Sequence, residues 1–300
     1  KLAIAGGLLL FVVFGIKAAM LPVGFWLPKT YAVASTPVAA IFTIMTKVGI
    51  YAILRVNGTV FDDAMAQSIF KNTLLLIGLI TSIYGVIGAI GAERLRRFVG
   101  FMVLSSVGTL LIAIAMFNTQ AWSAGLYYLV HSTLIAAAFY LFCGWITAQR
   151  GMFKDHLKVA PKIKNEKAAA LTYFLIAMMM AGLPPFSGFL GKVFILQATA
   201  ETAYQGWIIA IILIVSLLSI LALTRVGFIL FWRASPPEID PNEAAYQTYQ
   251  GLPAYAPNRN DTAIYIILAG LMAYVVFASP IQTYTVLTAQ QIQNHALYNQ

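Results

Sequence analysis

The chain has 300 residues, of which 60% are hydrophobic and only 10% are charged, and its mean hydropathy is +0.81. Soluble domains carry roughly 25% charged residues, so this composition excludes an ordinary soluble protein and predicts that lipid surrounds most of the chain. The single cysteine excludes a disulfide framework and a cysteine-ligated iron–sulfur cluster within this chain. The formal charge of +9 is therefore interpreted as membrane topology and not as a nucleic-acid site.

The hydrophobic segments predict an all-α, polytopic membrane protein with about eight transmembrane helices. Each segment is close to the roughly 20 residues that a helix needs to cross the hydrocarbon layer. The segments cover about residues 2–28, 33–54, 72–92, 98–117, 121–147, 168–200, 206–232 and 262–287. The first segment opens the chain without a methionine. We therefore expect the C-terminal portion of a longer protein, with a signal peptide as the alternative.

Two of these segments are interrupted by residues that break helices, so we expect two discontinuous transmembrane helices. The interrupting residues are Pro22 in the first segment, and Pro184, Pro185, Gly188 and Gly191 in the segment 168–200. Irregular backbone at membrane depth needs protein or a wet cavity to satisfy its polar groups, so both breaks are predicted to face the interior. Interrupted segments in two places are typical of repeat-built transporters, whose half-helices meet at a midplane site.

The charged loops predict the orientation of the chain. The loops at 93–97 and 150–167 are basic and lie two spans apart, as the positive-inside rule requires. The loop that holds Asp62 and Asp63 is not basic. We therefore expect the two basic loops in the cytoplasm and the C-terminus outside. The 233–260 loop falls on the cytoplasmic side by this count but fits the rule poorly.

Five ionisable residues lie within the apolar segments: Lys17, Lys47, His131, Lys192 and Arg225. Each costs roughly 2.5 to 3.5 kcal/mol near the bilayer centre, whereas leucine would fill a packing role without this cost. Burial makes a lysine easier to deprotonate, and histidine already titrates near neutral pH. We interpret all of them except Arg225 as a proton relay. The alternatives are snorkelling for Lys17 and Lys192, and a structural bridge or hydrogen bond for Lys47 and His131; snorkelling is the preferred interpretation of Arg225.

Polar side chains on the same helices are predicted to support this relay. Thr43 and Tyr51 lie one turn before and after Lys47, and Tyr127 and Tyr128 lie one turn before His131. Hydroxyls of the 98–117 span are candidates for holding water, although packing and bonding to the helix backbone are the alternative. These water-holding candidates are Ser105 and Ser106, with Thr109 close by.

Other motifs predict no further chemistry. Gly78, Gly85, Gly88 and Gly91 form a small-residue face, which predicts close helix packing and not a nucleotide loop, because no strand precedes it. The sequence suggests no cofactor, no metal site and no nucleic-acid partner.

Four stretches carry a resemblance to a known family. They are GIKAAMLPVGFWLPKTYAVASTPVAA, TKVGIYAILR, HSTLIAAAFYLFCG and GLPPFSGFLGKVFIL, in this order along the chain. They resemble the antiporter-like family shared by the Mrp-type multisubunit cation/proton antiporters and the proton-pumping membrane subunits of respiratory complex I. Within this family the four stretches are most similar to the D subunit of the Mrp-type antiporters.

The resemblance implies a fold of fourteen helices built from two inverted repeats, with the seventh and twelfth helices discontinuous. Residues 1–56 would then end the first repeat, and 57–232 would form the second. Residues 233–260 would be a cytoplasmic loop, and 261–300 the last helix with an external tail. The chain would hold helices seven to fourteen.

The resemblance also implies roles for single residues. Lys17 would match the lysine of the broken seventh helix, Lys47 that of the eighth, His131 the histidine of the eleventh, and Lys192 the charged residue of the broken twelfth. The family's fifth-helix glutamate, the partner of the seventh-helix lysine, is not in this chain. Ser106 stands where one complex I subunit has a second histidine, and Lys192 excludes the relative that has glutamate there.

We therefore expect a proton-translocating subunit of a Na⁺/H⁺ or K⁺/H⁺ antiporter, which is a secondary transporter and not an enzyme. Its partners would be other antiporter subunits and the lipid bilayer, in the inner (cytoplasmic) membrane of a bacterium. The first alternative is a proton-pumping membrane subunit of respiratory complex I or of a membrane-bound hydrogenase. The second is a membrane scaffold, which would leave the buried lysines unexplained.

Overall fold

The computed structural model describes residues 2–60, 64–160, 163, 165–200, 202–233 and 259–294. The acidic residues Asp62 and Asp63 lie outside the described residues, as do 234–258 of the predicted 233–260 loop and the end of the tail, 295–300.

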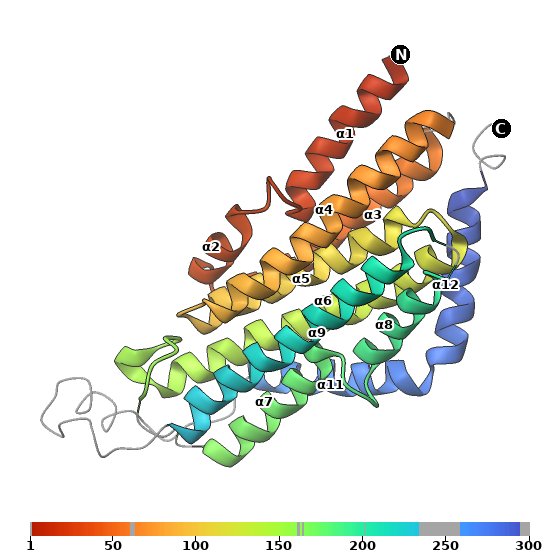
Figure 1. The fold of residues 1–300 in the computed structure, drawn as a ribbon. Coiled ribbons are helices and arrows are strands. Elements are labelled where there is room, and N and C mark those ends of the chain that lie inside the picture. The colour runs from red at the N-terminus through yellow and green to blue at the C-terminus, as the bar shows by residue number, and fades with distance from the viewer. Residues whose placement is uncertain are drawn as a thin grey trace, which may run out of the picture.

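Helices make up almost all of the described chain, and no strand occurs among the described residues. The helices are α1 (Leu2–Ala18), α2 (Trp26–Val33), α3 (Thr36–Val60), α4 (Ala64–Ile90), α5 (Leu95–Ala115), α6 (Thr119–Gln149), α7 (Glu166–Ala181), α8 (Ser187–Gln197), α9 (Gln205–Gly227), α11 (Arg259–Val276) and α12 (Ala278–Gln293). A short 3₁₀ turn (Gly151–Phe153) follows α6, and a π-helical turn (Phe228–Trp232) continues α9 (Figure 1).

Five helices of the described chain are long and apolar enough to cross a membrane: α3, α4, α5, α6 and α9. The bent pair α11 and α12 makes a sixth candidate span. The two interrupted segments, α1 with α2 and α7 with α8, occupy the remaining positions that the sequence predicts. The predicted all-α, polytopic membrane fold is therefore confirmed.

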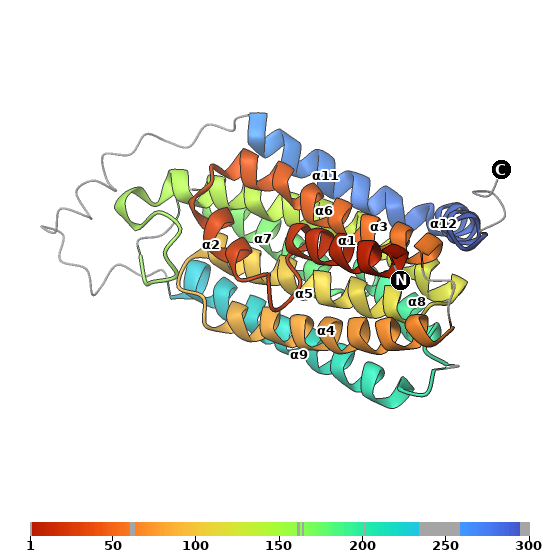
Figure 2. The same ribbon diagram turned by 90° about the horizontal axis from the view of Figure 1, so that it is seen from above.

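The last predicted span differs from the expectation of one continuous helix over 262–287. Helix α11 ends at Val276, and α12 continues at an angle of 81° to it. Pro280 explains the bend, because a proline ring clashes with the carbonyl four residues earlier, here that of Val276. In Figure 2, α11 lies along the bundle and α12 is seen nearly end-on.

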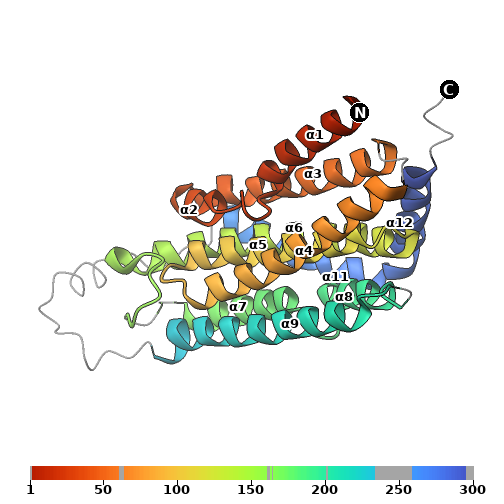
Figure 3. The ribbon, with the colours of Figure 1, turned by 45° about the horizontal axis from the view of Figure 1, so that its top comes forward.

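Helix α5 forms the centre of the bundle and is buried over almost its whole length. It contacts α2, α3, α4, α6 and α9. A helix that is hydrophobic on all sides is stable where lipid or other helices surround it, and other helices surround α5. Figure 3 shows α5 and α6 between α1 with α2 on one face and α7 with α9 on the other.

The predicted close packing of the glycine face is confirmed at three of its four positions. A Cβ atom on Gly85 would lie 2.4 Å from the Ser105 nitrogen of α5. Equivalent atoms on Gly78 and Gly88 would also lie under 3.0 Å from atoms of α5. At Gly91, just after α4, the nearest atom would be 3.8 Å away, so this glycine does not contribute to the close crossing.

The two basic loops lie together at one end of the bundle, as predicted. The Leu95 N–H donates to the Asp155 carbonyl at 2.7 Å, and the Leu157 N–H donates to the Glu93 carbonyl at 2.8 Å. The Arg96 guanidinium also bonds the Asp155 carboxylate, with Nε at 3.1 Å from Oδ2. These contacts join the turn after α4 to the loop after α6.

Candidate functional site

The break between α7 and α8 leaves a backbone carbonyl available for a lysine. Gly182 ends α7 in the left-handed conformation, with φ of +76°. Its N–H bonds the Met179 carbonyl at 3.2 Å, and the Leu183 N–H bonds the Met178 carbonyl at 3.1 Å, which is the Schellman pattern of a helix end. The Ala181 carbonyl is not used by this pattern. It accepts a hydrogen bond of 2.8 Å from the Lys192 ammonium.

Lys192 therefore joins three helices. It belongs to α8, bonds the last carbonyl of α7, and also donates to the Ser216 hydroxyl of α9 at 2.9 Å. A cation is favoured at the C-terminus of a helix, because the helix dipole concentrates negative potential there. The interrupted backbone thus provides a polar site for the lysine within an apolar segment.

His131 lies at the other side of the same break. Its Nδ1 is 2.8 Å from the Ser187 hydroxyl, at the first residue of α8. A Cβ atom on Gly188 would lie 2.6 Å from both His131 Nε2 and the Met179 carbonyl oxygen. Only glycine allows the histidine ring and the end of α7 to approach α8 so closely.

Two of the predicted helix-breaking residues, Gly188 and Gly191, do not interrupt a helix in the structure. Pro184 and Pro185 lie between α7 and α8, and Pro22 lies between α1 and α2. Gly188 and Gly191 lie inside α8 and do not break it. Their small size serves packing instead, because a Cβ atom on Gly191 would lie 3.0 Å from the Tyr128 ring.

A second buried lysine connects α3 to α5. The Lys47 side chain is 2% exposed, and its ammonium donates to the Ser106 hydroxyl at 2.8 Å. Ser106 in turn donates to the Val103 carbonyl of its own helix at 2.7 Å. Thr43, one turn before Lys47, is fully buried and bonds the Ala40 carbonyl at 2.7 Å and the Thr133 carbonyl of α6 at 3.3 Å.

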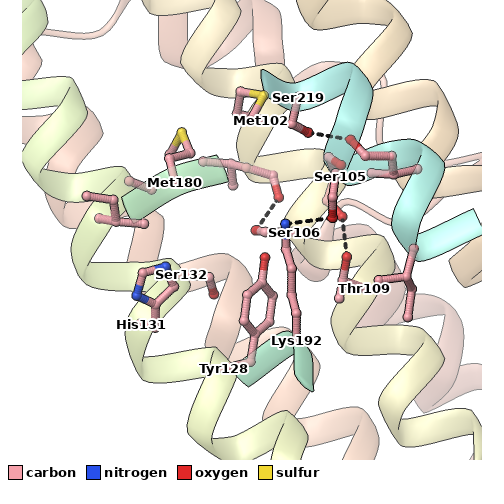
Figure 4. Close-up of a pocket in the computed structure, with 16 residues that line it drawn as sticks. Met102, Ser105, Ser106, Thr109, Tyr128, His131, Ser132, Met180, Lys192 and Ser219 are labelled. Atoms are coloured by element: carbon pink, nitrogen blue, oxygen red, sulfur yellow. Dashed lines mark hydrogen bonds between the residues drawn. The ribbon is translucent and has the colours of Figure 1, made fainter. Parts of the chain in front are cut away.

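A small cavity lies between these groups (Figure 4). Its volume is ≈ 30 Å³. This is enough for one or two water molecules where polar groups surround them. Its polar lining residues are Ser105, Ser106, Thr109, Tyr128, His131, Ser132, Lys192, Ser216 and Ser219. In Figure 4, Tyr128 stands between His131 and Lys192.

The cavity brings together most of the residues that the sequence predicts. His131 and Lys192 line it directly, and Lys47 reaches it through Ser106. No acidic side chain of the described residues lines it. Lys192 and His131 are therefore two bases that line one cavity. The arrangement suits the transfer of protons among bases, hydroxyls and water.

Other predicted residues do not line this cavity, among them Thr43. Tyr127 is buried, but its hydroxyl points to the Tyr274 carbonyl of α11 at 3.5 Å. The Tyr51 side chain is 41% exposed. Lys17 is exposed in the last turn of α1, and within the described chain its ammonium has no hydrogen bond or ion pair.

The backbone carbonyls at the first break do not bond the Lys17 ammonium, because main-chain and indole N–H groups use them. The Gly15 carbonyl accepts from the Met20 N–H, and the Ile16 carbonyl accepts from the Ala19 N–H and the Trp26 indole. Arg225 is exposed, and its guanidinium donates to the Ile90 carbonyl at the end of α4. Its snorkelling to the membrane surface stays a prediction.

Sequence reasoning missed the groups that hold Lys192 and His131. Ser216 and Ser187 were not among the candidate residues. The Ala181 carbonyl belongs to the backbone, so no residue type indicates it. A serine pair at positions 216 and 219, one turn apart in a mostly apolar span, is the pattern that would have indicated Ser216. No group of three or more His, Cys, Asp or Glu side chains that could hold a metal ion occurs among the described residues.

The sequence matches one family over most of its length. Residues 2–220 match the family described as "NADH:quinone oxidoreductase/Mrp antiporter, TM". The chain is 34% identical over 257 residues to the probable D subunit of a K(+)/H(+) antiporter from Rhizobium meliloti, covering 76% of this chain and 48% of that protein. It is 32% identical over 249 residues to the D subunit of a Na(+)/H(+) antiporter from Bacillus subtilis, covering 82% and 49%. The chain thus spans about half the length of these curated relatives.

Solved structures share the fold. The Mrp complex from Dietzia sp. DQ12-45-1b aligns with a TM-score of 0.82 at 24% identity, covering 98% of this chain and 60% of the matched chain. Respiratory complex I from Thermus thermophilus aligns with a TM-score of 0.75 at 17% identity, covering 98% and 60%. Identities this low show a common fold and nothing more about activity.

Proposed function

Because the chain belongs to the NADH:quinone oxidoreductase/Mrp antiporter family, we propose that it is the proton-translocating portion of the D subunit of a multisubunit Na⁺/H⁺ or K⁺/H⁺ antiporter. The two curated relatives, both named as the D subunit of an antiporter, support this choice within the family. The protein would be a transporter subunit and not an enzyme. Both relatives come from bacteria, which supports the inner (cytoplasmic) membrane of a bacterium as its location.

The observation that carries the proposal is the row of titratable groups around the small cavity. Lys47 bonds Ser106, Ser106 lines the cavity, and Lys192 lines the same cavity from α8. His131 lines it as well and bonds Ser187 at the break. A membrane helix tolerates such groups at a cost of several kcal/mol, which favours a role in transport over one in packing.

In the proposed mechanism, a proton moves from Lys47 through the Ser106 hydroxyl and cavity water to Lys192 and His131. A serine hydroxyl both donates and accepts, so it passes a proton when it rotates from the Val103 carbonyl toward water. Neutral Lys192 would lose its favourable charge interaction with the C-terminus of α7. The protonation state of Lys192 would therefore change how strongly α7 and α8 are held together, which is a means of gating the path.

The domain division is part of the same proposal. Residues 1–56 would end one inverted repeat and 57–232 would form the other, followed by the cytoplasmic loop 233–260 and the last span with its tail, 261–300. The two interrupted segments, α1 with α2 and α7 with α8, support this division, because each would be the broken helix of its repeat. Lys17 would serve the relay from the first of these breaks. Because the chain spans about half of its relatives, transport is proposed for the complete subunit in its complex.

The test uses inverted vesicles from antiporter-deficient cells that express the complete subunit with its partner subunits. A pH-sensitive dye reports the proton gradient when Na⁺ or K⁺ is added. We expect the parent to dissipate the gradient with one of these cations, Lys192→Ala to lose the response, and Lys167→Ala, which removes an exposed lysine at the start of α7, to retain it. A parent that assembles but responds to neither cation would contradict the proposal and favour a redox-driven proton pump.

A further inference from the structure

An apolar groove runs along the outer face of the bundle between α7 and α9, which lie side by side in Figure 3. Its lining includes the exposed side chains of Phe174, Phe228 and Trp232. The two helices touch beneath it, because the Tyr173 hydroxyl donates to the Leu223 carbonyl at 2.6 Å. Helices in contact lie about 8 to 10 Å apart, so the furrow between them accepts a methylene chain and not another helix.

A basic pocket continues this groove at one end. Thr224 and Phe228 line both, and three cations line the pocket: Lys158, Arg225 and Arg233. All three side chains are exposed. The Arg233 guanidinium lies 5.5 Å from the centre of the Phe228 ring. Among the described residues, no acidic side chain lines the groove or the pocket.

The pocket lies at the end of the bundle that carries the basic loops. Arg225 bonds the Ile90 carbonyl at the end of α4, three residues before the 93–97 loop. Lys158 belongs to the 150–167 loop, and its carbonyl accepts from Arg150 at 2.9 Å. By the positive-inside rule this end faces the cytoplasm, where the anionic headgroups of a membrane attract basic residues. Trp232, at the end of the π-helical turn that continues α9, suits the same interfacial depth.

We propose that this groove and pocket form a binding site for one anionic phospholipid. The phosphate and headgroup lie on Lys158, Arg225 and Arg233, and an acyl chain lies in the groove against Phe174 and Phe228. The three cations explain a preference for a negative headgroup, since a zwitterionic lipid has no net charge to offset theirs. The apolar groove explains why the ligand is a lipid and not a soluble phosphate.

The test measures lipid retained by the complete subunit in its assembled complex, using native mass spectrometry. Phosphatidylglycerol and phosphatidylcholine with identical acyl chains are supplied in detergent at equal concentration. We expect the parent to retain phosphatidylglycerol preferentially. Lys158→Gln with Arg233→Gln should lower this retention roughly 25-fold, since each cation near a membrane surface contributes about fivefold. Arg225 is left in place because it also caps α4.

The matched control is Lys154→Gln with Lys167→Gln, which removes two exposed lysines from the same end of the bundle but outside the pocket. It should leave retention within about twofold, because salt screens charges outside the pocket. Ala177→Trp fills the groove and should lower retention of both lipids. Equal retention of the two lipids by the parent, or equal loss in the two double variants, would overturn the proposal. So would photocrosslinking of Trp232→p-benzoylphenylalanine to a neighbouring subunit, since protein would then cover this end of the groove.

Discussion

The Lys192 ammonium lies where one half-helix has ended and the next has begun, and the residues around it explain why it is tolerated there. The Ala181 carbonyl and the Ser216 hydroxyl both accept from it. Lys47 has one hydroxyl partner, Ser106, and is almost completely buried. Serine is the residue that both lysines share, because its hydroxyl accepts from an ammonium without adding a counter-charge.

Ser106→Ala tests whether protons pass from Lys47 to the cavity through this hydroxyl. A hydrogen bond to a charged group contributes about 1.5 to 3 kcal/mol, so we expect the transport rate to fall roughly 10- to 100-fold in the vesicle assay. Ser219→Ala is the matched control. It lines the same cavity, but its hydroxyl bonds the Val215 carbonyl of its own helix at 2.7 Å. Equal effects of the two variants would contradict a path through Ser106.

At the scale of single residues, the sequence predicts the buried ionisable residues better than the groups to which they are hydrogen-bonded. Lys47, His131 and Lys192 are costly in an apolar segment and therefore visible in the sequence. Ser216 cannot be recognised in this way, because a serine in a helix often bonds the backbone of its own helix. Lys192, from which it accepts a hydrogen bond, also lies 24 residues away in the sequence. The place of Lys17, which is exposed and away from the cavity, also could not be predicted from its residue type.

At the scale of helices, the positions of prolines and glycines predict the interruptions but not their limits. Pro184 and Pro185 mark the second break, and Gly182 supplies its left-handed residue. Gly188 lies inside α8 and does not end a helix. The sequence could not show this, because it does not distinguish a glycine that allows close packing from one that ends a helix. Hydropathy alone predicts a continuous last span, since Pro280 changes the mean hydropathy little while it bends the backbone by 81°.

Gly85→Ala tests the close crossing of α4 and α5. The new Cβ atom would lie 2.4 Å from the Ser105 nitrogen and 2.6 Å from its Cα, and backbone atoms of a central helix cannot move aside as a side chain does. We expect a loss of about 1 to 3 kcal/mol in the free energy of unfolding, measured by thermal denaturation of the purified complete subunit. Gly91→Ala is the control, because its Cβ atom would be 3.8 Å from the nearest atom. A Gly85→Ala variant as stable as Gly91→Ala would show that the helices separate at no cost.

At the scale of the whole molecule, Arg96 joins three segments at the end that carries the basic loops. Its guanidinium bonds the Asp155 carboxylate in the loop after α6 and donates to the Ala34 carbonyl between α2 and α3 at 3.1 Å. The Asp155 side chain is only 1% exposed. Positive-inside reasoning predicts that these loops share one side of the membrane, but it treats Arg96 as a surface charge and cannot reveal that it pairs with a buried carboxylate.

The pair of Arg96 and Asp155 predicts how the stability of the protein depends on pH, and Arg96→Gln should reverse the direction of that dependence. Burial alone would raise the pKa of the Asp155 carboxyl, but hydrogen bonds and the charge of Arg96 outweigh it and lower the pKa below its ordinary value. The pair therefore stabilises the folded state at all pH values above the unfolded pKa of about 3.9, and this contribution is lost only as the pH falls through the lower, folded-state pKa. The parent should show no pH dependence from this group between about pH 5 and 7.

In Arg96→Gln the burial of Asp155 is no longer offset by this partner, although the charge of Arg150 still acts on the same carboxylate. Burial is the largest single influence on this carboxyl, so we expect its pKa to rise above the unfolded value even though backbone hydrogen bonds from residues 96 and 155 remain. Stability should then fall as the pH rises through the raised pKa. We expect a loss of about 3 kcal/mol at neutral pH, smaller at pH 5, measured by thermal unfolding of the complete subunit. Asp155→Asn added to Arg96→Gln should abolish the pH dependence, and Arg97→Gln, an exposed neighbour over the Phe101 ring, should change little. A deficit that is the same at both pH values would mean that Arg96 acts through its bond to Ala34 and not through Asp155.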